Sequence, residues 1–294
     1  MSLIDRLLNI TVKKRRPGAH ILHALAVRII KAYRNHDVEI STNGEAWLIE
    51  RIASLRPAFH AVDVGANLGE WSGHILQHAQ AERLIAYEAV PGTFALLEQA
   101  IHDSRALLVN AALSDAPGTL EIQAFADKPE FASHHVDYQA VGDVVTIEIA
   151  AHTGSEEMER LGLTHVDLLK IDTEGHDLSV LQGFDQALKN GAIDVIQFEY
   201  NYTSLIAGKS LKMFFDLLSP DYVLCRLLPN GLEICAYHPI LDDFTQTNWV
   251  AIRKPMLDEQ IMRHFAIRPA RGIIQRDLAI ELQSEPELKQ LILG

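Results

Sequence analysis

The residues best suited to chemistry lie just after apolar runs of the chain. The first group is AVDVGANLGEWS at residues 61–72, which is typical of a buried strand, a glycine-bearing turn and the start of a helix. Gly65 and Gly69 allow the backbone to approach a ligand closely, and free N–H groups at the helix start attract polar or anionic groups. Asp63 is costly to bury in an apolar strand unless it has a role. The stretch predicts a site for a nucleotide-like ligand.

The spacing within this turn distinguishes two such ligands. The dinucleotide fingerprint G-x-G-x-x-G needs glycines at positions 65, 67 and 70, where this chain has Gly65, Asn67 and Glu70. A carboxylate at position 70 directs negative charge at a pyrophosphate, whereas a cofactor with an amino-acid moiety and no phosphate tolerates it. The turn therefore favours S-adenosylmethionine over NAD. Glu88 ends the next apolar run and is expected to accept hydrogen bonds from both ribose hydroxyls; a solvated strand-end carboxylate is the alternative.

A third group, LLKIDTEGHD at residues 168–177, delivers several ionisable side chains into a turn. Asp172, Glu174 and His176 are expected to face the cofactor cleft, and Glu199 reaches the same rim from QFEYN at residues 197–201. Packed carboxylates and an imidazole perturb one another's pKa values, which can prepare a general base. A helix N-cap role is the alternative for Asp177.

The elements that must position these groups form an α/β fold. Short apolar runs alternate with helical stretches from residue 60, which predicts a mostly parallel sheet with helices on both faces. Two further strands, Thr119–Phe125 and Val144–Ile149, are interpreted as an elaboration over the edge of the sheet. The other predicted strands are His60–Val64, Arg83–Tyr87, Leu107–Ala112, Val166–Ile171, Asp194–Phe198, Tyr222–Leu227, Leu232–Tyr237 and Asn248–Arg253.

The turn signal Pro229-Asn230-Gly231 predicts a hairpin between two of these strands. Cys225 and Cys235 are equally far from Asn230, so a symmetric hairpin places them opposite each other. We interpret them as adjacent reduced thiols rather than a disulfide, because the cytoplasm is the expected compartment. That expectation rests on the lack of a signal-peptide pattern and of an apolar run long enough to span a bilayer.

The length and the net charge of the chain limit its domain organisation and the kinds of partner that we expect. The chain has 294 residues and a net charge of −13, which disfavours nucleic acid as a partner. We expect a helical accessory segment at residues 1–58, a cofactor-binding domain at 59–254 and a helical tail at 255–294. Residues 1–56 carry ten basic and five acidic side chains, and an apolar face there predicts either a helix on an anionic membrane or one packed as a lid or dimer contact. That face comprises Ile21, Leu22, Leu25, Ile29 and Ile30, next to Arg28, Lys31 and Arg34.

Taken in order, the motifs resemble the FkbM family of S-adenosylmethionine-dependent methyltransferases. The resemblance runs from Asn43-Gly44-Glu45 through VDVGANLGEWS, YEAVPG, NAALSD and LLKIDTEGHD to VLQGF and QFEYN, over roughly residues 43–253. It implies a class I methyltransferase fold, which is a Rossmann-like seven-stranded sheet with the last strand antiparallel. It also implies O-methylation of a sugar or secondary-metabolite hydroxyl. The usual IDVEGAE reads IDTEGHD here, which leaves a family role for Asp177 open.

The resemblance also implies which residues hold the cofactor. Asp63, Gly65, Asn67 and Gly69 would hold its methionine end and Glu88 its ribose. The adenine would lie by Asn110, Ala111 and Ala112, and the expected contacts also include Ala66, Ala89 and Asp172.

Methyl transfer to a hydroxyl is an in-line displacement that needs alignment and a base. A positioned base contributes about 10²- to 10⁴-fold. The candidates are His176, Glu174 and Glu199, together with His134 and His135 in a polar loop. No spacing demands a metal and we expect none, although Asp172 and Glu199 could hold a magnesium ion in a metal-assisted variant.

Two other classes of protein remain open. An NAD-dependent oxidoreductase would need a Tyr-x-x-x-Lys pair, which we do not find, and a non-catalytic adaptor would bind membranes through the basic N-terminus. The favoured partner is a small-molecule or glycan hydroxyl acceptor, and a homodimer is a further option.

Overall fold

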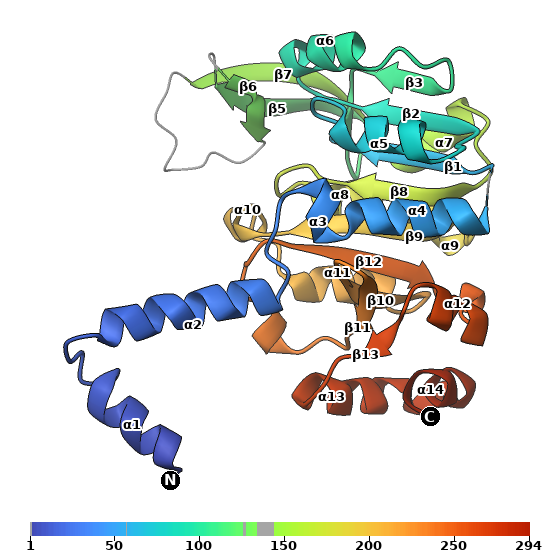
Figure 1. Ribbon diagram of the computed structural model, residues 1–294. Helices are drawn as coiled ribbons and strands as arrows, with labels where there is room; N and C mark the ends of the chain where they lie inside the picture. The colour runs from blue at the N-terminus through green and yellow to red at the C-terminus, as the bar shows by residue number, and fades with distance from the viewer. Residues whose placement is uncertain (1, 57, 126–127, 134–143) are drawn as a thin grey trace.

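A nine-stranded sheet runs through the computed structural model, which describes every residue except 1, 57, 126–127 and 134–143 (Figure 1). Its order is β13-β11-β10-β12-β9-β8-β1-β2-β3. The strands are β1 His60–Val64, β2 Arg83–Tyr87, β3 Ala106–Val109, β8 Val166–Ile171, β9 Ile193–Tyr200, β10 Tyr222–Leu228, β11 Gly231–Ile234, β12 Thr247–Arg253 and β13 Arg268–Pro269.

The pairing of the strands confirms the predicted α/β class. β3, β2, β1, β8 and β9 are parallel neighbours, and β12 inserts antiparallel between β9 and β10. These strands form the expected seven-stranded sheet with its last strand antiparallel. The count of seven was too low, because β11 and the short β13 extend the β10 edge.

Helices cover both faces of the sheet, as predicted. Alternate side chains of each strand point to opposite faces, so the two faces form two separate apolar clusters. One cluster includes side chains from α4 Glu45–Leu55, α5 Glu70–His78, α13 Ile273–Glu281 and α14 Pro286–Leu293, beside α12 Glu259–His264. The other includes side chains from α7 Gly154–Arg160, α8 Asp177–Gly183, α9 Asp185–Lys189 and α11 Leu211–Leu218. The remaining elements of the body are α3 Ile40–Asn43, α6 Pro91–Ala100, α10 Tyr202–Ile206, and the 3₁₀ turns η1 Pro239–Leu241, η2 Lys254–Met256 and η3 Leu282–Ser284.

A second, four-stranded sheet lies beside the β3 end of the main sheet (Figure 1). Its order is β4-β7-β5-β6, and its strands are β4 Ala112–Leu113, β5 Gly118–Phe125, β6 Lys128–Ser133 and β7 Val144–His152. The elaboration was therefore predicted, but not as a separate sheet with two additional strands. His134 and His135 lie outside the described residues.

The prediction of a single strand over Leu107–Ala112 is wrong. The chain leaves the main sheet after Val109 and joins the second sheet at Ala112. Asn110 explains the break, because its side-chain amide donates to the backbone carbonyls of Glu88 at 2.8 Å and Ala89 at 3.1 Å. Those bonds turn the chain at Asn110, although the apolar residues on either side suggest one continuous strand.

The predicted placement of the two cysteines is also wrong. The hairpin has a two-residue turn in which Leu228 pairs with Gly231, so Cys225 lies opposite Ile234. A one-residue change of register moves a side chain to the other face of a sheet. Cys225 and Cys235 are accordingly buried in different apolar clusters, and both are free thiols.

The N-terminal helices divide into two kinds. α4 packs into the core, whereas α1 Leu3–Thr11 and α2 Ala19–Tyr33 reach away from the body (Figure 1). Ala19 is the one buried residue of α2, so this helix is not packed along the body as the interpretation of a packed lid expected. Within the described residues, no helix combines the length and the apolar character needed to cross a bilayer.

Candidate functional site

A pocket of about 300 Å³ lies at the carboxyl ends of β1, β2 and β8. This is the edge at which open α/β sheets bind ligands. The turns after the three strands and the start of the second sheet form its walls. The pocket therefore brings together the three sequence groups that were expected to meet.

The turn between β1 and α5 is held in a conformation suited to glycine and asparagine. Gly65 has φ +85° and Asn67 has φ +49°. The backbone N–H groups of Gly65 and Ala66 both donate to the carbonyl of Tyr87 at 2.9 Å, which fixes the turn against the end of β2. A Cβ on Gly65 would lie 1.9 Å from the carbonyl oxygen of Asp172. Position 65 can therefore hold only glycine without moving β8.

Glu88 connects the chain after β1 to the chain after β2 through hydrogen bonds of its side chain. Its carboxylate accepts from the backbone N–H of Asn67 at 2.9 Å and from that of Val90 at 2.8 Å. Burial raises the pKa of Glu88, although these two bonds oppose the rise. A carboxylate has about four lone-pair sites, so it can still accept from a ligand's hydroxyls.

Asp63 on β1 and Lys170 on β8 are buried ionisable side chains at paired positions of the sheet, and Lys170 also lines the pocket. Asp63 is fully buried; one of its oxygens accepts from the Ser72 hydroxyl at 2.7 Å, and the other has no hydrogen-bond partner. Burial raises the pKa of Asp63, and the charge of Lys170 opposes that rise. Lys170 lies 3.2 Å from Asp172, and neighbouring carboxylates outweigh burial and raise its pKa.

Acidic side chains gather where β8 and β9 end. Asp172, Glu174 and Glu199 each place a carboxylate oxygen within 4.8 Å of the others. Burial, followed by the charges of Asp172 and Asp177, raises the pKa of Glu174 to about 7. Burial and the charge of Asp172 raise the pKa of Asp177 to about 7, and the same causes raise that of Glu199. Glu199 accepts from the Asn201 and Gln246 side chains, at 2.6 and 2.5 Å.

His176 lies at the pocket wall as the residue before α8. Its Nε2 is 2.9 Å from the Ser114 hydroxyl, and that hydroxyl donates to Asp115 at 2.9 Å. Asp177 does not cap α8, because its carboxylate accepts from the backbone N–H and the hydroxyl of Thr173. The Ser114 hydroxyl, just after β4, thus orients the imidazole.

Two buried polar atoms at the pocket lack a protein partner. They are the indole N–H of Trp71 and the hydroxyl of Thr93, which belong to side chains that line the cavity. Buried polar groups are normally hydrogen-bonded, so a bound ligand or water is the expected partner. Ala111, Ala112 and Ile122 add an apolar wall.

The charge of the lining is strongly negative. Five carboxyl groups and one ammonium group line the cavity, namely those of Glu45, Glu70, Glu88, Asp172, Glu174 and Lys170. Such a surface repels a diphosphate and attracts a cationic ligand.

The structure brings most of the predicted site residues to the pocket. Asp63, Gly69, Asn110 and Glu199 do not line it: Asp63 lies below it, Gly69 begins α5, Asn110 holds the end of β2, and Glu199 lies behind Glu174. Their direct contacts with a cofactor stay predictions. The residues that do line it are Gly65, Ala66, Asn67, Glu88, Ala89, Ala111, Asp172, Glu174 and His176.

The lining residues to which sequence reasoning assigned no role include Glu45, Trp71, Thr93 and Lys170. Lys170 had a signal, because it is a charged residue inside an apolar strand, as Asp63 is. The other three reach the pocket only through the packing of α4, α5 and α6.

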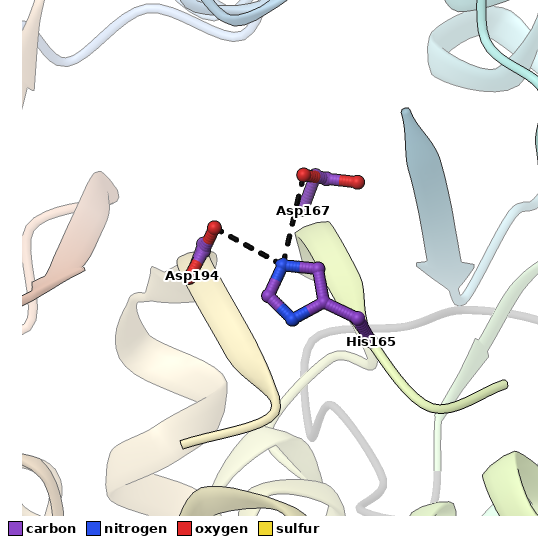
Figure 2. Close-up of side chains that lie close together, drawn as sticks. All are labelled: His165, Asp167 and Asp194. Carbon is purple, nitrogen blue, oxygen red and sulfur yellow. Dashed lines mark hydrogen bonds and ion pairs between the residues drawn. The ribbon is translucent and has the colours of Figure 1, made fainter. Parts of the chain in front are cut away.

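A second group of potential metal ligands lies at the opposite edge of the sheet. Figure 2 shows His165 between Asp167 and Asp194, with its Nε2 at 3.7 and 3.1 Å from their carboxylates. Arg56 forms ion pairs with both aspartates, and Arg253 lies 3.2 Å from Asp194. The arginines already occupy the place of a cation, so the group is an ion-pair network that joins the chain after α4 to the starts of β8 and β9.

A family model described as the methyltransferase FkbM domain matches residues 63–219, which is more than half of the chain. The match spans the pocket-forming turns from β1 to α11. The chain belongs to the FkbM methyltransferase family.

Individual relatives of this FkbM-family chain are distant. Methyltransferase sdnD from Sordaria araneosa is 26% identical over 165 residues, which cover 46% of this chain and 64% of that protein. The crystal structure of methyltransferase FkbM from Methylobacillus flagellatus is 16% identical with a TM-score of 0.41, over 66% of this chain and 44% of that one. The structure of TrmK from M. capricolum, in complex with S-adenosyl-homocysteine, is 11% identical with a TM-score of 0.39, over 71% of this chain and 68% of that one. The chain therefore spans less than two thirds of the length of the first two relatives.

Proposed function

We propose that this FkbM-family chain transfers the methyl group of S-adenosylmethionine to a hydroxyl of a saccharide or secondary metabolite. The observation that carries the proposal is the negative lining of the pocket at the carboxyl edge of the sheet. S-adenosylmethionine carries a sulfonium and an ammonium against a single carboxylate, whereas NAD carries two phosphates. Electrostatic complementarity therefore favours the former. The buried thiols Cys225 and Cys235 agree with a reducing compartment, for which we propose the cytoplasm.

The donor groups of the pocket fit that cofactor. Glu88 can accept hydrogen bonds from the ribose, and the wall of Ala111 and Ala112 can pack on the adenine. The unpartnered N–H of Trp71 and the ammonium of Lys170 can bind the carboxylate of its methionine end. The bound cofactor supplies an electrophilic methyl carbon on sulfur.

The residues at the end of β8 supply a base for the acceptor. Glu174 lines the pocket, and its pKa of about 7 lets it hold or release a proton near neutral pH. His176 lines the same wall and has its imidazole oriented by Ser114. In this proposal one of the two would remove the hydroxyl proton as the oxygen–methyl bond forms and the bond between that methyl carbon and sulfur breaks. The bond's electron pair would return to sulfur, which leaves S-adenosylhomocysteine. Glu199 stays a weaker candidate, because it lies behind the pocket wall.

Thermal melts with S-adenosylmethionine, S-adenosylhomocysteine and NAD test the cofactor. A ligand at about a hundred times its dissociation constant adds about 2.7 kcal/mol of unfolding free energy. We expect both adenosyl-sulfur ligands to raise the Tm by several degrees and NAD to leave it unchanged. A shift with NAD alone would favour an oxidoreductase, and no shift in folded, ligand-free protein would favour an adaptor.

A pH profile tests the base once an acceptor has been found. Because Glu174 must be ionised to accept a proton, we expect kcat/KM to rise with pH through about 7 and then to level off. Glu174→Gln should remove that limb and lower kcat about 10²-fold or more, with the affinity for S-adenosylmethionine retained. If the limb persists in Glu174→Gln and disappears in His176→Ala, the base is His176.

A metal-assisted version of the reaction is a second candidate. The specific observation in its favour is the convergence of Asp172, Glu174 and Glu199 within 4.8 Å. A divalent cation held there would lower the pKa of an acceptor hydroxyl. Activity that is lost in EDTA and restored by magnesium would establish this version, and activity that is unchanged in EDTA would eliminate it.

A further inference from the structure

The N-terminal arm, which we define as residues 2–34, carries half of the exposed large apolar side chains in the part of the chain that the structure describes. In α2, Ile21, Leu25 and Ile29 follow one another at intervals of four residues and are 63%, 53% and 59% exposed. His20 and Lys31 lie on the opposite face of the same helix, and Arg28 lies at the boundary beside Ile21. α2 is therefore amphipathic, and its three exposed apolar side chains belong to none of the apolar clusters of the described residues.

The first helix and the bend repeat this pattern. α1 exposes Leu3 and Ile4 at 75% and 67% on one face, and carries Asp5 and Arg6 on the other. Four consecutive basic residues at 13–16 are all exposed at and just after the end of α1, before α2. The arm thus combines two apolar helix faces with a concentrated positive charge.

The charge of the arm contrasts with that of the rest of the chain. The arm carries eight basic and one acidic side chain, for a net charge of +7, whereas the remaining residues carry 18 basic and 38 acidic side chains, for −20. A nucleic acid would neutralise the basic residues but leave the apolar faces in water. An anionic lipid surface satisfies both, because acyl chains accept the apolar face and headgroups accept the basic side chains.

We propose that the arm docks this protein on an anionic membrane, with α1 and α2 lying in the interface. The arm is attached firmly at its base. Arg34 forms an ion pair with Asp243, and the side chain of Asn35 donates to the carbonyls of Asn43 at 2.6 Å and Leu227 at 3.0 Å. Docking therefore holds the whole body at the membrane rather than a loose tail.

Vesicle flotation of the full chain tests the proposal. We expect binding to phosphatidylcholine vesicles that contain about one third phosphatidylglycerol, no binding to pure phosphatidylcholine, and release at about 0.5 M salt. A basic side chain near an anionic surface strengthens binding about five-fold, so replacing four of them should weaken binding at least about tenfold. The charge variant is Lys13→Gln, Lys14→Gln, Arg15→Gln and Arg16→Gln.

A second variant tests the apolar face of the arm, after the first has tested its basic residues. Ile21→Ser, Leu25→Ser and Ile29→Ser together should also abolish flotation, while the Tm stays unchanged because these side chains are more than half exposed and lie outside the apolar clusters of the body. Matched controls change exposed residues of the body and should bind as the wild type does. They are Ile240→Ser with Ile273→Ser and Ile280→Ser, and Lys189→Gln with Lys212→Gln, Arg263→Gln and Arg271→Gln.

Several outcomes would overturn the proposal. One is wild-type protein that does not float with anionic vesicles, and another is body controls that lose binding as fully as the arm variants do. A third is a dimer, detected by light scattering without lipid, that dissociates in the apolar variant while vesicles are not bound. That result would assign the face to a second copy of the chain.

Discussion

The Glu88 carboxylate connects the glycine turn after β1 to the proposed ribose site. It accepts two backbone N–H bonds and is 7% exposed. Glu88→Gln keeps the shape but removes the charge and turns an amide N–H toward one of those donors. Because hydrogen bonds to charged groups contribute about 1.5–3 kcal/mol, we expect S-adenosylmethionine to bind about 10- to 100-fold more weakly by calorimetry.

The control for Glu88→Gln is Glu82→Gln, an exposed carboxylate just before β2 whose loss should leave the affinity unchanged. The Tm without ligand must also be measured, because the variant loses a backbone contact. An affinity within twofold of the wild type would remove Glu88 from the ribose site.

Asp177 links stability to pH. Its pKa in the folded chain is about 7, against a usual value of 3.8, so between these pH values the folded chain holds a proton that the unfolded chain has released. The free energy of unfolding therefore falls as pH rises through this window. Asp177→Asn removes this residue's contribution to the pH dependence. We therefore expect the Tm of the variant, measured in EDTA, to drop less than that of the wild type from about pH 5 to about pH 8.

The exposed Asp185 on α9 supplies the control, since Asp185→Asn should keep the wild-type drop. A drop that is identical in Asp177→Asn and the wild type would contradict the assignment. Glu174 and Glu199 shift in the same direction, so the variant should reduce the drop without abolishing it.

Among single residues, the sequence predicts the positions of charged groups at strand ends, because the spacing within each motif determines where the strand stops. The residues predicted in this way to lie at one cleft do line one pocket, namely Glu88, Asp172, Glu174 and His176. Trp71 could not be found in this way, since an indole at helical spacing reads as core until its N–H proves to be unpartnered.

At the scale of elements, the turn after β1 depends on a close approach between two strand ends. A Cβ at position 65 meets the backbone of Asp172, while one at Gly208, which also has positive φ, meets nothing within 4 Å. We expect Gly208→Ala to cost about 1–2 kcal/mol from its φ alone, and Gly65→Ala to cost about 2–5 kcal/mol from φ and crowding together. Denaturant unfolding measures both, and equal losses would show that the approach is looser than described.

Element boundaries were predictable where the hydrophobic pattern changed and unpredictable where a side chain ended the strand. The predicted bounds of β1, β2 and β8 match the structure. The break between β3 and β4 depends on what the amide of Asn110 contacts, and the hairpin register depends on a turn of two residues rather than three. Neither is encoded in the periodicity of the chain.

For the whole molecule, Arg56 connects the N-terminal helices to the sheet. It forms ion pairs with the buried Asp167 and Asp194. Each aspartate also has another partner, and Figure 2 shows the one they share, His165. Arg56→Met leaves these carboxylates less compensated, and we expect a loss of about 1–3 kcal/mol in the free energy of unfolding. Arg263→Met breaks an exposed pair with Glu259 and should change it by less than about 0.5 kcal/mol.

Denaturant titration of the two variants separates these expectations. Equal stability of Arg56→Met and Arg263→Met would mean that the cluster adds nothing beyond an ordinary surface pair. A more stable Arg56→Met would mean that desolvation of the guanidinium costs more free energy than its ion pairs contribute.

The burial of Cys225 and Cys235 on opposite sides of one sheet has a practical use. Each thiol becomes reactive only when water enters its own layer, so the two act as natural reporters on separate halves of the core. Mass spectrometry after brief alkylation in mild denaturant would resolve which thiol is modified first. Simultaneous labelling would indicate one cooperative unit, and sequential labelling would indicate two layers that open independently.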